Sequence, residues 1–202
     1  MDASQRVGPR NYGLPLAKSE YPLTESSMSR IGYYDGSHVN NNILKTLDEL
    51  VQKDPDHVAF CWAKMEEMQK WSFDLEDPLP HDSIKRGDFW DAIDKAAYGM
   101  QEAGVKKGDT AIVFVPMSIQ LYIFLAALQR IGAVSVFLDS WARRDHLGIS
   151  AKMVKPSAMI SFEAAFQLTA GVPELDAIPI RISVGPATAE YQGSYESFMG
   201  LS

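Results

Sequence analysis

Residues 104–139 read GVKKGDTAIVFVPMSIQLYIFLAALQRIGAVSVFLD, and this stretch decides the fold class. Its residues 110–115 are apolar and rich in β-branched side chains, which predicts a buried strand. Ser118 can cap a helix that is apolar almost all round, and Gly132 ends this helix. Residues 133–138 form the next predicted strand. A strand, a helix and a strand within about thirty residues make a βαβ unit, so the two strands should run parallel with a right-handed crossover.

A second unit of the same kind follows the first. Leu147, Ala151 and Val154 mark one face of a helix, and a strand is predicted at about residues 157–161. Residues 179–184 predict one more strand after a loop that contains Gly and Pro. We therefore expect an α/β fold, a mostly parallel open sheet with helices on both faces, in which the first three of these strands are adjacent.

The rest of the chain yields a coarser prediction. Residues 1–40 have no sustained periodicity and are expected to form an extended arm or loop, whereas residues 41–202 are expected to form the α/β subdomain. The acidic, Pro-containing stretch 64–82 is typical of a solvated hairpin, with paired catalytic carboxylates as the less favoured alternative. The further predicted elements are a helix from Asn41 or Asn42 to Lys53, strands at 57–63 and 83–86, a helix from the cap Asp88 to Ala103, and the start of a helix at 194–199.

Composition excludes several classes of protein. The chain has 202 residues, of which 46% are hydrophobic, and this is enough for one domain with a sizeable core. Its formal net charge of −7 disfavours a nucleic-acid-binding role. The four histidines are scattered, so no metal site is predicted, and the single Cys61 is expected to be a buried structural thiol.

The sequence also bears on where the protein is found. One cysteine allows no intrachain disulfide, and the first residues are followed by no apolar run, so we expect no secretory signal and a cytoplasmic location. Residues 111–129 carry no charge, but Pro116, Ser118 and Gln120 interrupt them. A buried strand and a buried helix explain this stretch better than a transmembrane span does.

The familiar phosphate-binding and nucleophile motifs are missing. The sequence has no G-x-G-x-x-G after a strand, no G-x-x-x-x-G-K-S/T and no G-x-S-x-G. We therefore assign no catalytic residue, and the cofactor-binding residues stay unknown.

The best candidate site follows the strand at 133–138. Ligands of open parallel sheets bind beyond the carboxyl ends of the strands, and here those ends lead into a basic segment in an otherwise acidic chain. A helix that starts there would add N–H donors for an anion, whereas the alternative, which we favour, is a solvated basic helix face. The candidate residues for a substrate or anion are Trp141, Arg143, Arg144, His146, Ser161 and Phe162.

The order of these motifs resembles the amino-terminal part of the adenylate-forming ligases, a family that includes acyl-CoA synthetases and fatty-acyl-AMP ligases. The family typically shows G-V-x-x-G-D-x-V, then P-N-S or similar, then a stretch like G-A-V-x-V-x-x-D/N-P. Here GVKKGDTA stands at 104–111, PMS at 116–118 and GAVSVFLDS at 132–140. Residues 83–90 resemble the short strand that enters the family's first long helix, and the resemblance covers about residues 40–185.

Two residues depart from the family pattern, and a larger part of the pattern is absent. Ser140 stands where the family has Pro, and Met117 stands where Asn is commoner, so the shape of the acyl pocket should differ. The chain ends at Ser202, before the family's Ser/Thr/Gly-rich phosphate loop, its later ATP-binding motifs and its carboxy-terminal domain with the catalytic lysine.

The resemblance implies a parent enzyme that joins a carboxylate to the α-phosphate of ATP, releases pyrophosphate and usually passes the acyl group to a thiol. ATP, Mg²⁺ and, as the thiol, CoA would belong to that parent, and none is assigned to this chain. The partners would be the rest of the parent chain and a small carboxylic acid. The chain is expected to be an inactive amino-terminal fragment. The alternatives are a free-standing, non-enzymatic α/β binding module and, disfavoured by the missing glycine motif, a dinucleotide oxidoreductase.

Overall fold

The structure is a computed structural model and describes residues 43–72, 78–138, 144–185 and 190–201. The chain divides between residues 41 and 42, and residues 42–202 form a compact unit. All of the described residues belong to the second unit, and the arm expected at residues 1–40 lies outside them.

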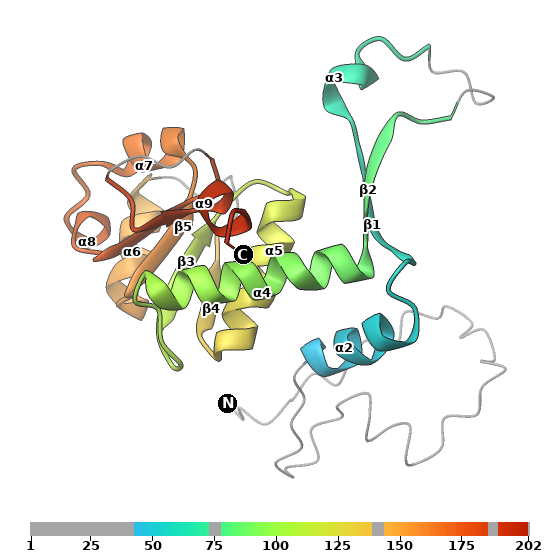
Figure 1. Ribbon diagram of the computed structural model, residues 1–202. Helices are drawn as coiled ribbons and strands as arrows, with labels where there is room; N and C mark the ends of the chain where they lie inside the picture. Colours follow the sequence, from blue (N-terminus) through green and yellow to red (C-terminus); the bar gives the residue numbers. More distant parts are fainter. Residues whose placement is uncertain (1–42, 73–77, 139–143, 186–189, 202) are drawn as a thin grey trace, which may run out of the picture. The chain divides into compact units, whose positions relative to one another are not determined.

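The centre of the second unit is a five-stranded, wholly parallel sheet with the order β4-β3-β5-β6-β7 (Figure 1). Thr110 pairs with Val134, and Ala111 pairs with both Ser135 and Ala158, so β3 lies between the two strands that follow it in sequence. The predicted parallel core is therefore confirmed. The strands are β3 (Thr110–Phe114), β4 (Val134–Phe137), β5 (Ala158–Ser161), β6 (Ile180–Ser183) and the short β7 (Gly193–Ser194).

Helices cover both faces of this sheet (Figure 1). One face packs on α4 (Arg86–Glu102), α5 (Ile119–Ile131) and α9 (Tyr195–Met199), and the opposite face packs on α6 (Arg144–Val154), α7 (Glu163–Thr169) and α8 (Pro173–Asp176). Alternate residues of β3 divide between the two layers: Ala111 and Val113 face α4 and α5, whereas Ile112 and Phe114 face α6 and α7. Both layers are buried, since the members of these two clusters are at most 8% exposed.

The ends of the central helix follow the predicted capping chemistry. The Ser118 hydroxyl accepts a hydrogen bond from the Leu121 N–H at 3.3 Å, and Gly132 adopts the left-handed conformation with φ 81°. The prediction for Asp88 is wrong: α4 begins at Arg86, after Lys85, so Asp88 lies in the first turn, where its charge still suits the positive end of the helix dipole.

Upstream of the sheet lie α2 (Ile43–Lys53) and an antiparallel hairpin of β1 (Val58–Ala63) and β2 (His81–Lys85), with α3 (Met65–Met68) after β1. One side of the hairpin packs on the helical layer through Phe60, whose ring lies 4.9 Å from the rings of both Phe89 and Tyr122. The next residue, Cys61, points to the other side and is exposed. The prediction of a buried thiol is therefore wrong, because only one side of this two-stranded ribbon is covered by described residues.

Three helices were not predicted: α3, and two that matter for the site. Residues 163–176 form α7 and α8, a region expected to be loop because Gly171 and Pro173 interrupt it.

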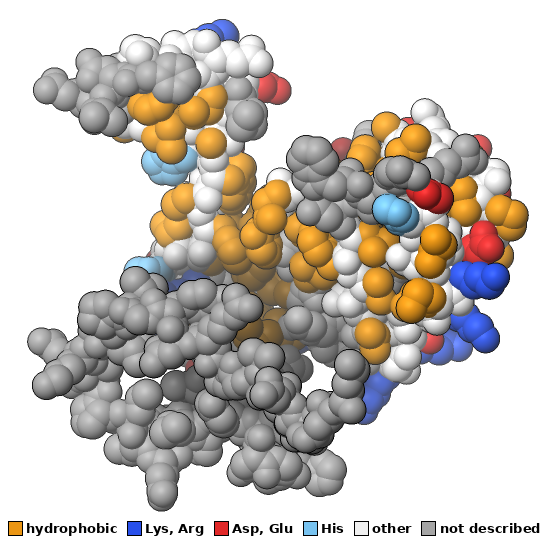
Figure 2. Space-filling model, turned by 180° about the vertical axis from the view of Figure 1, so that it is seen from behind, with side chains coloured by type: hydrophobic (Ala, Val, Ile, Leu, Met, Phe, Trp, Pro, Cys, Tyr) orange, Lys and Arg blue, Asp and Glu red, His pale blue; other side chains and the backbone are white. Residues whose placement is uncertain are grey.

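Figure 2 shows hydrophobic side chains reaching the surface in several places among charged ones. Within the described part of the chain, no helix is long and apolar enough to cross a membrane.

Candidate functional site

The sheet has a switch point between β3 and β5. These adjacent strands are parallel, and Phe114 pairs with Ser161 at their carboxyl ends. Beyond these ends the chain leaves β3 towards α5 on one face and leaves β5 towards α7 on the other. Two connections that diverge in this way open a crevice, and ligands of open α/β sheets bind in such a crevice.

A pocket of about 280 Å³ lies at this switch point. One wall is the end of β3 and the residues after it, and the other wall is Phe162 with the first turns of α7. All of its lining residues have hydrocarbon side chains: Phe114, Val115, Pro116, Phe162, Ala164, Ala165 and Leu168. We call it the switch-point pocket.

A buried hydroxyl ties the two strand ends together beside this pocket. Ser161 is fully buried, and its hydroxyl donates a hydrogen bond of 2.6 Å to the carbonyl of Phe114. The rings of Phe114 and Phe162 stack with centroids 6.4 Å apart. The Phe162 carbonyl in turn accepts hydrogen bonds from the N–H groups of Ala165 and Phe166 at the start of α7. The backbone acceptors of Phe114 and Phe162 are therefore already engaged within the protein.

The structure describes part of the predicted anion site. Ser161 and Phe162 lie at the carboxyl end of β5, as the sequence predicted. Arg144 is the first residue of α6, and His146 is exposed in the first turn of the same helix. Trp141 and Arg143 lie outside the described residues. The gathering of Arg143, Arg144 and His146 near Ser161 and Phe162 therefore stays a prediction.

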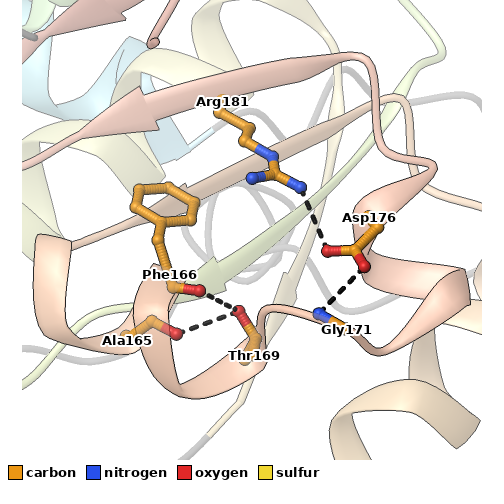
Figure 3. A network of polar contacts seen from close by, with 6 residues as sticks. All are labelled: Ala165, Phe166, Thr169, Gly171, Asp176 and Arg181. Carbon is orange, nitrogen blue, oxygen red and sulfur yellow. Dashed lines mark hydrogen bonds and ion pairs between the residues drawn. The ribbon is translucent and has the colours of Figure 1, made fainter.

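The far end of α7 is held by the polar network in Figure 3. The Thr169 hydroxyl donates to the carbonyls of Ala165 and Phe166 at 2.9 and 3.1 Å. The carboxylate of Asp176 accepts a hydrogen bond from the Gly171 N–H at 2.9 Å and lies 3.6 Å from the guanidinium of Arg181. The Thr169 bonds therefore lie within α7, whereas the Asp176 contacts join the turn after α7 to α8 and β6.

The near end of α7 is held by an aromatic side chain from the segment before β7. The Tyr191 ring stacks on Phe166 with centroids 4.8 Å apart, and its hydroxyl hydrogen-bonds to the carboxylate of Glu163. Burial, this hydrogen bond and the negative charges of Glu163 and Glu190 raise the pKa of Tyr191 to about 12, against a smaller opposing effect of Arg181. Tyr191 therefore stays a neutral donor to Glu163 at physiological pH.

A second, more open pocket of about 630 Å³ lies between α6 and α8. Its lining mixes apolar residues with Asp145, Lys152 and Glu174, and it is not at the carboxyl edge of the sheet. Among the described residues, no group of three or more His, Cys, Asp or Glu side chains could hold a metal ion.

Comparison with known proteins identifies the family. Residues 47–196 match the family model described as AMP-binding enzyme, which covers most of the chain. The chain therefore belongs to the AMP-binding enzymes, and it corresponds to an amino-terminal part of an AMP-binding ligase.

Curated relatives agree with this assignment. An acetyl-coenzyme A synthetase from Penicillium chrysogenum is 30% identical over 94 residues, which are 46% of this chain and 12% of that protein. One from Pseudoalteromonas atlantica is 29% identical over 129 residues, which are 64% of this chain and 19% of that protein. The chain thus spans less than a fifth of the length of these relatives.

Solved structures show the same fold. A long-chain-fatty-acid-CoA ligase from Archaeoglobus fulgidus superposes with a TM-score of 0.63 over 80% of this chain and 30% of that one, at 19% identity. A mutant form of coronafacic acid ligase from Pectobacterium brasiliense gives a TM-score of 0.61 over 78% of this chain and 29% of that one, at 15% identity.

Proposed function

We propose that this chain is the amino-terminal fragment of an ATP-dependent ligase that activates a carboxylic acid as its acyl-adenylate and transfers the acyl group to CoA, and that the fragment alone is inactive. The observation that carries the proposal is the family match over residues 47–196 in a chain that spans less than a fifth of its curated relatives. We further propose a cytoplasmic location, which the single cysteine supports.

No residue of the described part of the chain can be assigned to holding the phosphates of ATP, its Mg²⁺ or the charge that develops in adenylation. The sequence has no glycine-rich loop of the type that cradles phosphates, and the described residues contain no cluster of oxygen ligands for a metal. Adenylation needs both, together with a cation against the developing charge. We therefore assign those groups to the rest of the parent chain, which is the partner of this fragment.

Acid-dependent exchange of labelled pyrophosphate into ATP tests the proposal. The isolated chain should give no exchange with acetate, octanoate or benzoate, whereas the parent encoded by the longer gene should exchange with at least one carboxylic acid. Acid-dependent exchange by the pure isolated chain would disprove the inactivity. A gene without a phosphate loop after codon 202 would favour the free-standing binding module.

We also propose that the basic segment at the carboxyl edge attracts an anionic substrate of the parent. Ser161 and Phe162 mark this edge, and Arg144 and His146 begin the helix that leaves it. In the parent, replacing Arg143 and Arg144 by Ala should raise KM for the acid or for CoA while the melting temperature changes little. Unchanged KM values for ATP, acid and CoA would leave these arginines as a solvated helix face.

A further inference from the structure

We propose that the switch-point pocket binds an uncharged apolar ring, and that it holds this ring by hydrophobic contact with the side chains of its walls. The inference goes beyond the ligase assignment, since it concerns binding by this chain alone and requires neither ATP nor turnover.

The size of the pocket sets the size of the occupant. An apolar cavity of about 150 Å³ holds one benzene molecule, and the switch-point pocket has about 280 Å³. A single six-membered ring with a short substituent therefore fits, and the substituent can point towards the open side.

The chemistry of the walls sets the polarity of the occupant. No residue that lines the pocket carries a charged or hydrogen-bonding side chain. The carbonyl of Phe114 is occupied by the Ser161 hydroxyl, and the carbonyl of Phe162 is occupied by two N–H groups of α7. A polar ligand group placed against this part of the wall would lose its water without gaining a partner, so an apolar group is favoured.

The walls are also formed before a ligand arrives. Phe114 and Ala165 are 5% and 1% exposed and belong to the core on the α6–α7 side of the sheet. Tyr191 contacts Glu163 and Phe166 of α7, and Asp176 links Gly171, two residues after this helix, to Arg181 of β6. A preformed apolar pocket loses little conformational entropy on binding, and the two aromatic residues in its lining, Phe114 and Phe162, offer ring surface to an aromatic ligand.

Three exposed positions on α7 allow a test that leaves the buried core unchanged. Ala164 lines the pocket and is exposed, so Ala164→Phe should fill the space with its own ring. Gln167 is exposed on the same helix and does not line the pocket, but its amide donates to the Glu163 carboxylate at 2.9 Å, so the control is Gln167→Phe read against Gln167→Ala, which loses the same bond without adding a ring. Leu168 lines the pocket and is 56% exposed, so Leu168→Asn should make its rim polar with little effect on folding.

The experiment is a titration of the full 202-residue chain with benzyl alcohol, followed by saturation-transfer NMR of the ligand. We expect binding with a dissociation constant on the order of 1 mM, with stronger transfer to the ring protons than to the CH₂OH group. Ala164→Phe should weaken binding about tenfold or more, Leu168→Asn about threefold, and Gln167→Phe less than twofold. Melting curves of the variants should match the wild type.

Three results would overturn the inference. The first is the absence of saturation transfer to the wild-type chain at tens of millimolar probe. The second is equal binding by folded Ala164→Phe and wild type, and the third is an equal loss in Gln167→Phe. Each of these outcomes is independent of pyrophosphate exchange, so a failure here is distinct from a failure of the ligase proposal.

Discussion

The ring of Phe198 in α9 occupies the space where a side chain at Gly99 in α4 would begin. A Cβ built on Gly99 would overlap three carbons of this ring, and one built on Gly193 in β7 would overlap the opposite end of the ring. Phe198 is therefore held between a helix and a strand that approach it closely because both present glycine. This contact anchors the last helix of the chain to the sheet.

We predict that Gly99→Ala lowers the free energy of unfolding by about 1–3 kcal/mol, because the ring has to move out of a packed core. Urea unfolding of the 202-residue chain measures this change. The control is Tyr98→Ala on the same helix, at a residue that is 56% exposed, and it should change stability by no more than about 0.5 kcal/mol. The double variant Gly99→Ala/Phe198→Leu should lose less than the sum of the single losses, and strict additivity would contradict the proposed overlap.

Ser161→Ala should lower the free energy of unfolding by about 1–2 kcal/mol. The substitution removes a buried hydroxyl and leaves the Phe114 carbonyl without that donor. Ser157 is the matched control, because it precedes the same strand but makes only a 3.5 Å contact to Thr110 and is half-buried. Equal losses in the free energy of unfolding for Ser157→Ala and Ser161→Ala would show that the hydrogen bond at the strand ends contributes no more than the weaker contact of Ser157.

The parallel core could be predicted because its signals are local. The β-branched run at 110–114, the cap Ser118 and the left-handed Gly132 lie within one βαβ unit, and right-handed crossover then fixes the pairing. The carboxyl ends of β3 and β5, which border the switch-point pocket, could also be placed together from sequence.

The second wall of the pocket could not be predicted from sequence. It depends on α7, which has only seven residues and no side-chain cap, so its apolar residues show too few turns for a helical period. What holds α7 in place comes from residues far along the chain, namely Tyr191 and Arg181. The exposure of Cys61 was missed for a similar reason, since the apolar run at 58–63 does not reveal that its hairpin is covered on one side.

The Tyr191 phenol should lose its proton at a higher pH than an ordinary tyrosine does. Its pKa in the folded protein is about 12, against an ordinary value of 10.0, so the fold favours the neutral phenol. The contribution of this raised pKa to the free energy of unfolding is therefore fully present below pH 10, and it is lost as the pH rises through about 12. Burial raises the pKa of Tyr195 as well, so tyrosinate absorbance is best followed in a Tyr195→Phe background, where Tyr191→Phe should remove the late step. A late step that persists in this variant would contradict the assignment.

Lys155 adopts φ 46°, which makes it the non-glycine residue with positive φ among those the structure describes. It follows α6, and its N–H still donates to the Ala151 carbonyl at 2.8 Å, so it closes the helix in the left-handed conformation that glycine usually supplies. This conformation costs a residue with a side chain about 1–2 kcal/mol. Glycine would remove this cost, but its greater freedom in the unfolded chain would cancel part of the gain in stability.

We therefore predict that Lys155→Gly raises the free energy of unfolding by up to about 1 kcal/mol. The matched control is Lys152→Gly, three residues earlier and inside α6, where glycine should instead destabilise by about 1 kcal/mol. Both variants remove one exposed lysine, so the change in net charge cancels in the comparison. Urea unfolding at constant ionic strength measures both effects. Changes of the same sign in the two variants would contradict the left-handed helix end, because only a position with positive φ gains from the loss of its side chain.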